Sequence, residues 1–301
     1  MNLTIANNKS KMEIFSSIFQ LLKNWSNTIT IHFKETNVYI QLMDKSQICL
    51  AYVQLNSTWF SSYKNENKDR KASMDSHQLS ILMGNALKND ILEIVLNDEN
   101  DDKIQFKCLH NDTNTNTIHM EETKDTKETK DIKKTKETKE TKKTKPSVVN
   151  VKGSYNTHFE LLLMDVEEEE FTIPDVEYDV DIIMESKKFV DILHEIAAFG
   201  DTIHIIATEN NLFLQTTGDT GTIKIDYPID NLEEYGISEG VTVSVYYSLG
   251  HLLKMCCSTK LSDLVHISLH EEYPMSIAYT ALTEDNYSAR FFIASKIVDE
   301  E

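Results

Sequence analysis

The sequence is poor in arginine, glycine, proline and cysteine, and it has no long apolar run. Arginine occurs only at Arg70 and Arg290, a bias that fits an AT-rich genome and carries no functional signal. No stretch of about 18 apolar residues is present, so no segment is expected to cross a membrane. The opening residues, MNLTIANNKSKMEIF, lack the basic, apolar and small-residue regions of a secretory signal.

The cysteines are too few and too irregularly spaced to form a disulfide framework. The four cysteines, Cys49, Cys108, Cys256 and Cys257, lack the spacing of a metal site, and the adjacent pair is poorly suited to a disulfide. This usage is typical of a reducing compartment, the cytoplasm or the nucleus. The sequence therefore predicts neither a metal site nor a cofactor.

An excess of positive charge is also missing. The formal net charge is −19, whereas proteins that hold nucleic acid usually offer a basic surface to its phosphates. The imbalance is larger outside residues 120–146, which contain 10 lysines against 7 acidic residues and leave a net charge of −22 elsewhere. Any contact with DNA is therefore expected to be local or weak.

Catalytic and ligand-binding motifs are absent as well. The acidic stretch DENDDKIQF (98–106) lacks the glycine of a calcium loop, and a hairpin turn fits it better. GDTGT (218–222) has neither the Lys-Ser/Thr of a phosphate loop nor a helix after it. His194–Glu195 and His204 follow no zinc spacing, and no Ser, Cys or His lies in a nucleophile motif. We expect no enzymatic activity and no catalytic residue.

What the sequence does contain is an internal repeat. A shift of 174 residues lays FSSIFQLLKNWSNTITIHFKETNVYIQ over FVDILHEIAAFGDTIHIIATENNLFLQ without a gap, and apolar positions match throughout. The identical positions are Phe15/Phe189, Thr28/Thr202, Glu35/Glu209, Asn37/Asn211 and Gln41/Gln215. Agreement of helical and strand periodicities over 27 residues predicts a tandem duplication.

Each copy has the pattern of two helices packed on a strand-rich sheet. The helices are expected around residues 15–22 and 76–88 in the first copy, and around 189–196 and 248–257 in the second. The expected strands are 28–33, 37–42, 90–96 and 103–109, then 202–207, 211–216, 263–269 and 275–281. This predicts an α+β fold with domains at 1–163 and 179–301, joined by the connecting segment 164–178.

One stretch near residues 110–153 stands outside this pattern. EETKDTKETKDIKKTKETKETKKTK repeats threonine, lysine and acid with almost no apolar residue, so burial cannot offset the entropy of ordering it. We interpret it as a flexible loop inserted between two strands. A basic tether for nucleic acid is the alternative.

The connecting segment raises a separate question. In EEEEFTIPDVEYDV (167–180), large apolar groups follow four glutamates directly. On this segment alone, the favoured interpretation is an edge strand whose Phe171 and Ile173 pack inward and which ends at Pro174. The alternative is an exposed apolar surface that another chain covers.

Four blocks resemble the eukaryotic sliding-clamp family, proliferating cell nuclear antigen. They are VYIQLMDKSQICLAYVQL, LMDVEEEEFTIPDVEY, AAFGDTIHI and FFIASKIVDEE, in family order and at compatible spacings. The resemblance spans nearly the whole chain, apart from the insertion. It implies a DNA-clamp fold with two repeated domains, and a homotrimer closed head to tail around duplex DNA.

The resemblance also assigns a pocket for a short docking peptide, which decides the question about the connecting segment in favour of a covered surface. Its glutamates would attract the basic flanks of such a peptide. Two positions depart from animal relatives, Gln47 in place of histidine and Ser295 in place of proline. The pocket residues implied are Met43, Gln47, Ile48, Leu50, Phe171, Ile173, Pro174, Tyr178, Pro274, Phe292, Ile293, Ala294 and Ser295.

Two further surfaces follow from the resemblance. The DNA-facing positions on the free faces of the helices are Ser16, Ser17, Gln20, Lys23, Ser80, Lys88, Lys187, His194, Lys254 and Lys260. Several of them are basic in well-known relatives and polar here, so retention on DNA is expected to depend on ring closure more than on charge. The subunit interface would pair a strand near 155–163 with one near 220–227, using Phe159, Leu161, Thr222 and Lys224.

The resemblance implies a processivity factor for replication and repair. Its expected partners are duplex DNA, DNA polymerase, a clamp loader, and flap-endonuclease and ligase-type proteins with docking peptides. The nucleus is expected, or a cytoplasmic replication compartment if the protein is viral. The alternatives are a checkpoint-type clamp subunit in a hetero-ring, a processivity factor acting as monomer or dimer, and a scaffold that never encircles DNA.

Overall fold

The computed structural model describes residues 1–66, 69–97, 102–110, 155–167, 171–173, 176–256, 259–280 and 287–297. The expected inserted loop, apart from His110, and the expected turn at 98–101 lie outside these residues. Among the described residues, no helix is both long enough and apolar enough to span a membrane.

The described part of each half contains two helices, as the repeat predicts. The helices are α1 (Lys9–Leu22), α2 (Ser76–Ala86), α3 (Ser186–Ala197) and α4 (Leu249–Cys256), with short 3-10 turns η1 (Ser57–Trp59) and η2 (Ile229–Asn231). The strands of the first half are β1 (Asn2–Ala6), β2 (Thr28–Phe33), β3 (Asn37–Met43), β4 (Cys49–Asn56), β5 (Ser62–Lys64), β6 (Arg70–Asp75), β7 (Ile91–Val95), β8 (Lys103–Leu109) and β9 (Thr157–Leu162). Those of the second half are β10 (Val180–Glu185), β11 (Thr202–Ala207), β12 (Leu212–Gly218), β13 (Gly221–Tyr227), β14 (Glu234–Ile237), β15 (Val243–Ser248), β16 (Leu264–Leu269), β17 (Met275–Thr280) and β18 (Tyr287–Ile293).

Local chemistry accounts for where the helices of the first half begin. The side chain of Asn8 accepts a hydrogen bond from the amide of Lys11 at 2.9 Å, and Asp75 accepts one from the amide of Gln78 at 2.8 Å. Each cap satisfies an amide that the first helical turn leaves without a partner. The predicted strands at 28–33 and 202–207 are observed as β2 and β11 with the same bounds.

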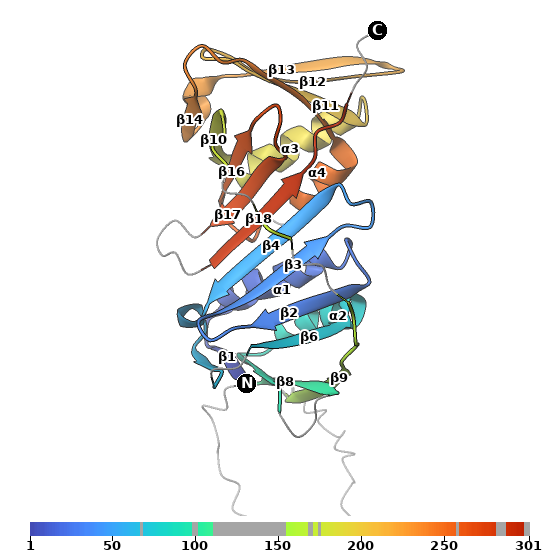
Figure 1. The fold of residues 1–301 in the computed structure, drawn as a ribbon, viewed down its shortest axis with the longest axis vertical. Helices are drawn as coiled ribbons and strands as arrows, with labels where there is room; N and C mark the ends of the chain where they lie inside the picture. The colour runs from blue at the N-terminus through green and yellow to red at the C-terminus, as the bar shows by residue number, and fades with distance from the viewer. Residues whose placement is uncertain are drawn as a thin grey trace, which may run out of the picture.

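Three antiparallel sheets organise the chain. A nine-stranded sheet has the order β14-β10-β16-β17-β18-β4-β3-β2-β6 and runs through both halves (Figure 1). The halves meet where β18 pairs with β4, in a register that runs from Tyr287 opposite Leu55 to Ile293 opposite Cys49. The remaining sheets are β5-β1-β7-β8-β9 and β13-β12-β11-β15.

The duplication is visible in these strand orders. Each half provides one five-stranded unit, ending at β9 or β18, and one four-stranded unit, ending at β13 or β4. Within the chain, β18 and β4 join their two units into the large sheet. Their counterparts β9 and β13 are edge strands that lie at opposite ends of the long axis (Figure 1).

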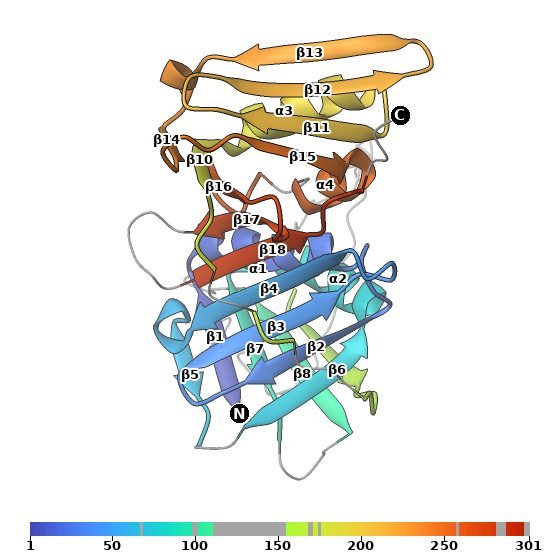
Figure 2. The same ribbon diagram turned by 45° about the horizontal axis from the view of Figure 1, so that its top comes forward.

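The two faces of the nine-stranded sheet have different roles. At the β4–β18 joint, the buried residues Phe291 and Ala51 lie directly opposite each other, and the ring of Phe291 contacts Trp25 at the end of α1, with centroids 5.7 Å apart. The next pair, Phe292 and Leu50, points to the other face because side chains alternate along a strand. Figure 2 shows α1 and α2 behind β2, β3 and β4. The helices therefore cover one face, and the β4–β18 pair exposes apolar groups on the other.

Candidate functional site

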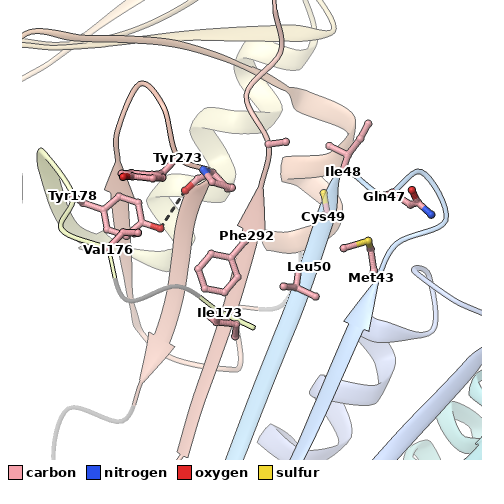
Figure 3. Close-up of a pocket in the computed structure, with 12 residues that line it drawn as sticks. Met43, Gln47, Ile48, Cys49, Leu50, Ile173, Val176, Tyr178, Tyr273 and Phe292 are labelled. Carbon is pink, nitrogen blue, oxygen red and sulfur yellow. Dashed lines mark hydrogen bonds between the residues drawn. The ribbon is translucent and has the colours of Figure 1, made fainter. Parts of the chain in front are cut away.

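A cavity of about 220 Å³ lies on the sheet face opposite the helices, over the β4–β18 joint. Its lining comes from the end of β3 and the start of β4, from the connecting segment, and from the last strands of the second half (Figure 3). The lining residues are Met43, Gln47, Ile48, Cys49, Leu50, Ile173, Val176, Tyr178, Tyr273, Pro274, Phe292 and Ala294. Segments far apart in sequence thus form one mainly apolar surface.

Most of the pocket residues expected from the sequence line this cavity, and the exceptions have structural reasons. Ile293 is fully buried because it lies on the helix side of β18, so its expected place in the pocket is wrong. Ser295 is exposed beyond the end of β18 and is not part of the lining. Pro174 lies outside the described residues. Cys49, Val176 and Tyr273 line the cavity but were not expected. Cys49 and Val176 lie inside the blocks that carried the resemblance, whereas Tyr273 lies outside all four.

Phe171 was expected in the pocket but is not among its lining residues. Its backbone instead holds the connecting segment in place. The amide of Phe171 donates to Oε1 of Gln41 at 3.0 Å, and Nε2 of Gln41 donates to the Phe171 carbonyl. The side-chain amide of Gln41 thereby imitates a neighbouring strand and holds the segment against β3. The interpretation of Phe171 and Ile173 as part of an edge strand is wrong, because the described residues of the segment belong to no strand before Val180, where β10 begins.

Substitution of Gln41 by alanine should loosen this wall of the pocket. Two hydrogen bonds of about 1 kcal/mol net each are lost, so hydrogen exchange of the Phe171 amide should accelerate roughly 10-fold or more. The matched control is Gln215→Ala, because Gln215 is the repeat counterpart of Gln41 and bonds to the ring of His204 instead. Exchange at Phe171 that is unchanged in Gln41→Ala would show that the amide pair does not hold the segment.

The loop between β3 and β4 is shaped by one carboxylate. Oδ1 of Asp44 accepts hydrogen bonds from the amides of Ile48 at 2.9 Å and Cys49 at 2.8 Å. Burial alone would raise the pKa of Asp44, but these bonds and one from Ser46 outweigh it and lower the pKa below its usual value. Gln47 has a φ of 59°, a left-handed conformation that is uncommon for residues other than glycine. The loop is therefore held in a specific shape beside the pocket.

The other walls are fixed by backbone contacts. The hydroxyl of Tyr178 donates to the carbonyl of Pro274 at 3.2 Å, which ties the connecting segment to the β16–β17 turn (Figure 3). The amide of Ala294 donates to the carbonyl of Ile48 at 3.0 Å. Burial raises the pKa of Tyr178, so the hydroxyl remains protonated at neutral pH and available as a donor. The cavity is formed before any ligand arrives.

The helix surfaces differ from the sequence expectation at three serines. Ser16, Ser17 and Ser80 are buried rather than exposed, so their expected presentation on a free face is wrong. The reason is the packing of α1 against α2: Nε2 of Gln20 donates to the Ser80 carbonyl at 2.7 Å, and the Ser80 hydroxyl donates back to Oε1 at 2.9 Å. Lys23 donates to the same Oε1 at 3.1 Å.

The remaining positions that we expected to face DNA are exposed lysines and one exposed histidine. They are Lys88 just after α2, Lys187 and His194 on α3, Lys254 on α4 and Lys260 beyond it. Asp191 and Glu195 are exposed on α3 as well, so the positive charge of that helix is diluted. These helices present sparse basic groups rather than a continuous basic patch.

The edge strands β9 and β13 each have one apolar and one polar face. Phe159 and Leu161 are half-buried on β9 and pack against the core. On β13 the half-buried residues are Ile223, Ile225 and Tyr227, whereas Thr222 and Lys224 point to the exposed face. Thr222 and Lys224 therefore lie on the opposite face from the half-buried residues of β13, and the expectation that they join Phe159 and Leu161 in a subunit interface stays a prediction.

Comparison with known proteins identifies a consistent set of relatives. Two family models match: "Proliferating cell nuclear antigen, N-terminal domain" over residues 7–138 and "Proliferating cell nuclear antigen, C-terminal domain" over residues 172–296. The proliferating cell nuclear antigen of Caenorhabditis elegans is 26% identical over 295 residues, which cover 96% of this chain and 95% of that protein. That of Chaetomium thermophilum is 24% identical over 153 residues, which cover 48% of this chain and only 57% of that protein.

A solved structure extends the comparison to the fold. The crystal structure of the PCNA2–PCNA3 complex from Sulfolobus tokodaii has a TM-score of 0.73 and 20% identity, covering 98% of this chain and 99% of that one. The similarity therefore includes both halves and the way they are joined. It agrees with the α+β clamp fold expected from the sequence.

Proposed function

Since this chain belongs to the proliferating cell nuclear antigen family of sliding clamps, we propose that three copies close head to tail around duplex DNA. The ring tethers DNA polymerase and other replication and repair proteins through the pocket over the β4–β18 joint. Members of the family are non-enzymatic scaffold clamps, consistent with the absence of catalytic motifs in the sequence.

The proposal rests on the two edge strands β9 and β13, each of which pairs with a neighbouring strand on one side only in the described structure. The β4–β18 joint shows that a five-stranded and a four-stranded unit of this repeat fit together edge to edge. Strand β9 ends the other five-stranded unit and β13 ends the other four-stranded unit, and these two edges lie at opposite ends of one chain. Because the two edges differ, their pairing is head to tail, and such pairing closes into a ring when the rotation is suitable. Closure also covers edges that would otherwise invite aggregation.

The existing joint gives the register of the proposed one. Strands β7 and β16 follow the matched helices α2 and α4 at equivalent spacing, so Ile94 of β7 corresponds to Ile267 of β16. The strand pairings lead from Ile94 to Phe159 of β9 and from Ile267 to Phe291 of β18, so Phe159 corresponds to Phe291. Ile223 of β13 corresponds to Ala51 of β4, which lies directly opposite Phe291. Transferred to two subunits, this register places Phe159 opposite Ile223 of the neighbour. The apolar side chains of Phe159 and Ile223 would then cover each other across the joint.

The same register also sets the other cross-strand pairs. Because the pairing is antiparallel, it places Thr157 opposite Ile225 and Leu161 opposite Gly221 on the half-buried face. On the exposed face it places Glu160 opposite Thr222, with Lys224 as a diagonal neighbour within reach of the long glutamate side chain. Cross-strand pairs of opposite charge or of apolar groups each stabilise a sheet by about 0.2–1 kcal/mol. A slip by one residue would bring the polar faces against the core, so the alternation itself specifies the register.

The pocket fits a short peptide with apolar anchors. Its lining is mostly aliphatic and aromatic, and its walls are held by hydrogen bonds before binding. Glu177, Glu271 and Glu272 are exposed and adjacent in sequence to lining residues, so basic residues beside the anchors would be favoured. DNA polymerase, a clamp loader, flap endonuclease and ligase-type proteins are the proposed owners of such peptides.

The sparse cations of the helices support retention by enclosure. Few phosphate contacts release few counterions, so binding should depend weakly on salt. Loaded on a nicked circle, the protein should remain through a wash of about 0.5 M salt, and cutting the circle should release it at least roughly 10-fold faster. Equal retention on circular and linear DNA would contradict enclosure.

A hetero-ring is the second candidate. The solved structure reported above is a complex of two different subunits, PCNA2 and PCNA3. If this chain behaves similarly, β9 and β13 would pair with a different chain, and the purified protein would remain a monomer or dimer until that chain is added. The mass in solution separates this candidate from the homotrimer.

A further inference from the structure

A second cavity lies on the other side of the β4–β18 joint, beside α4. Its volume is about 260 Å³, and it is lined by Asn24, Trp25, Asp44, Lys45, Ser46, Cys49, His251 and Lys254. Cys49 also borders the docking pocket, so the two cavities share one residue at the start of β4. The first half provides the loop before β4, and the second half provides α4. The cavity therefore lies where the two repeats meet.

Three chemically compatible side chains converge in this cavity. One oxygen of Asp44, Sγ of Cys49 and one ring nitrogen of His251 all lie within 4.8 Å of one another. Nε2 of His251 is 3.6 Å from Oδ2 of Asp44. Ligands bound at the usual zinc distances are about 3.4–3.6 Å apart in a tetrahedron, so this pair already has the required separation. The spacing along the chain conceals the cluster, because the histidine comes from the other repeat.

We propose that Asp44, Cys49 and His251 bind one zinc ion, with a water molecule in the fourth position. A thiolate, an imidazole and a carboxylate are the ligand types that zinc takes, whereas magnesium and calcium prefer sites made of oxygen. The two negative ligands would neutralise the charge of the ion itself. The cavity has ample room for an ion and its water.

The groups around the cluster orient the ligands. Nδ1 of His251 is 3.0 Å from the hydroxyl of Ser248, a contact that leaves Nε2 directed at Asp44. The amides of Ile48 and Cys49 occupy Oδ1 of Asp44, so Oδ2 is the oxygen that faces the histidine. Outer hydrogen bonds of this kind fix the tautomer and direction of metal ligands. Without metal, the hydroxyl of Ser46 donates to Oδ2 of Asp44 and lies 3.1 Å from Nε2 of His251, so it occupies the ion's position and would move aside when the ion binds.

Zinc binds cysteine as the thiolate, which makes binding dependent on pH. The ion must therefore displace a proton from sulfur, and one proton should be released for each ion bound. Affinity should accordingly increase as the pH rises from 6 to about 8. This gives a readout that weak surface binding through carboxylates does not share.

The ion would fasten the floor of the docking pocket. Gln47 and Ile48 line that pocket and lie within the loop that Asp44 and Cys49 delimit. Anchoring this loop to α4 would favour the pocket shape seen here, a consequence that rests on the proposed function. The site itself requires neither DNA nor a docking peptide. Failure to bind metal and failure to act as a clamp are therefore separate results.

The test is titration of the full chain with zinc, and with cobalt as a spectroscopic substitute. We expect one strong site per chain, with a thiolate-to-cobalt charge-transfer band. His251→Gln and Cys49→Ala should weaken binding by about 100-fold or more, since even outer partners of a metal site are worth 10–100-fold. His251 is partly exposed, so its variant should fold even if the variant of buried Cys49 does not.

The matched control is His270→Gln. His270 faces Asp179 at 3.4 Å, a histidine–carboxylate pair that no cysteine completes among the metal-ligating clusters of the described residues. This variant should bind zinc and cobalt as the original protein does. The proposal is overturned if the cobalt complex lacks the thiolate band, or if His251→Gln binds with the stoichiometry and affinity of the original chain.

Discussion

Replacement of Ile225 by lysine should convert the protein from a species of about 104 kDa, three times 34.6 kDa, into a monomer. Ile225 is half-buried on the apolar face of β13. In the single subunit a lysine there can extend its amine to solvent. Under a paired β9 strand the charge would be buried, at a cost of roughly 3 kcal/mol or more for each joint. That corresponds to at least about 100-fold weaker association, and mass photometry or light scattering at micromolar concentration would detect it.

The matched control is Thr222→Lys on the same strand. Thr222 lies on the exposed face of β13, so an added lysine remains in solvent whether or not the ring forms. This variant should keep the trimeric mass, and circular dichroism should show that both variants are folded. If Thr222→Lys dissociates the ring and Ile225→Lys does not, the assignment of the faces is reversed.

Truncation of two anchors in the pocket should abolish peptide docking. Ile173 and Phe292 come from the connecting segment and from β18, and they face the same cavity (Figure 3). The double variant Ile173→Ala with Phe292→Ala should remove roughly 2–4 kcal/mol of binding free energy. A docking peptide with micromolar affinity would then bind about 30–1000-fold more weakly. Fluorescence anisotropy with a labelled peptide measures this, and partner co-purification should be lost.

The control removes similar apolar area outside the pocket. Ile81 and Phe199 are 54% and 39% exposed, and neither lines the cavity. Ile81→Ala with Phe199→Ala should leave peptide affinity unchanged. Equal losses in the two double variants would show that the effect is general destabilisation and not the removal of anchors. The trimeric mass should persist in both variants, because neither pair belongs to β9 or β13.

Periodicity predicted the four helices and the strands β2, β3, β7 and β8 with their counterparts β11, β12, β16 and β17, because their apolar residues recur regularly. It did not predict β1 and β10, the first strand of each half. The strand 28–33 and its counterpart 202–207 have the predicted bounds, since turn residues border both. The pocket was predicted from resemblance and not from pattern: its walls are Ile173, Phe292 and Leu50, which lie on three segments that only the β4–β18 pairing brings together.

The errors have two physical origins. Ser16 and Ser80 are small, and small polar side chains allow α1 and α2 to approach closely, so the contact buries residues that hydrophobicity alone places on the surface. Ile293 was assigned to the pocket with its neighbour Phe292, although successive side chains of a strand point to opposite faces. The cluster around Cys49 depends on a contact between repeats that no local pattern contains.

A disulfide across the proposed joint tests the closed ring most directly. Residues directly opposite in an antiparallel pair have Cα atoms about 4.5–5.5 Å apart, within the range that a disulfide spans. Glu160→Cys with Thr222→Cys should therefore give, on oxidation, one covalent trimer of about 104 kDa, three times 34.6 kDa, that denaturant does not separate. Glu160→Cys with Asp226→Cys is four residues out of register and should not cross-link. A monomer in the first case, or an equally cross-linked product in the second, would contradict the ring.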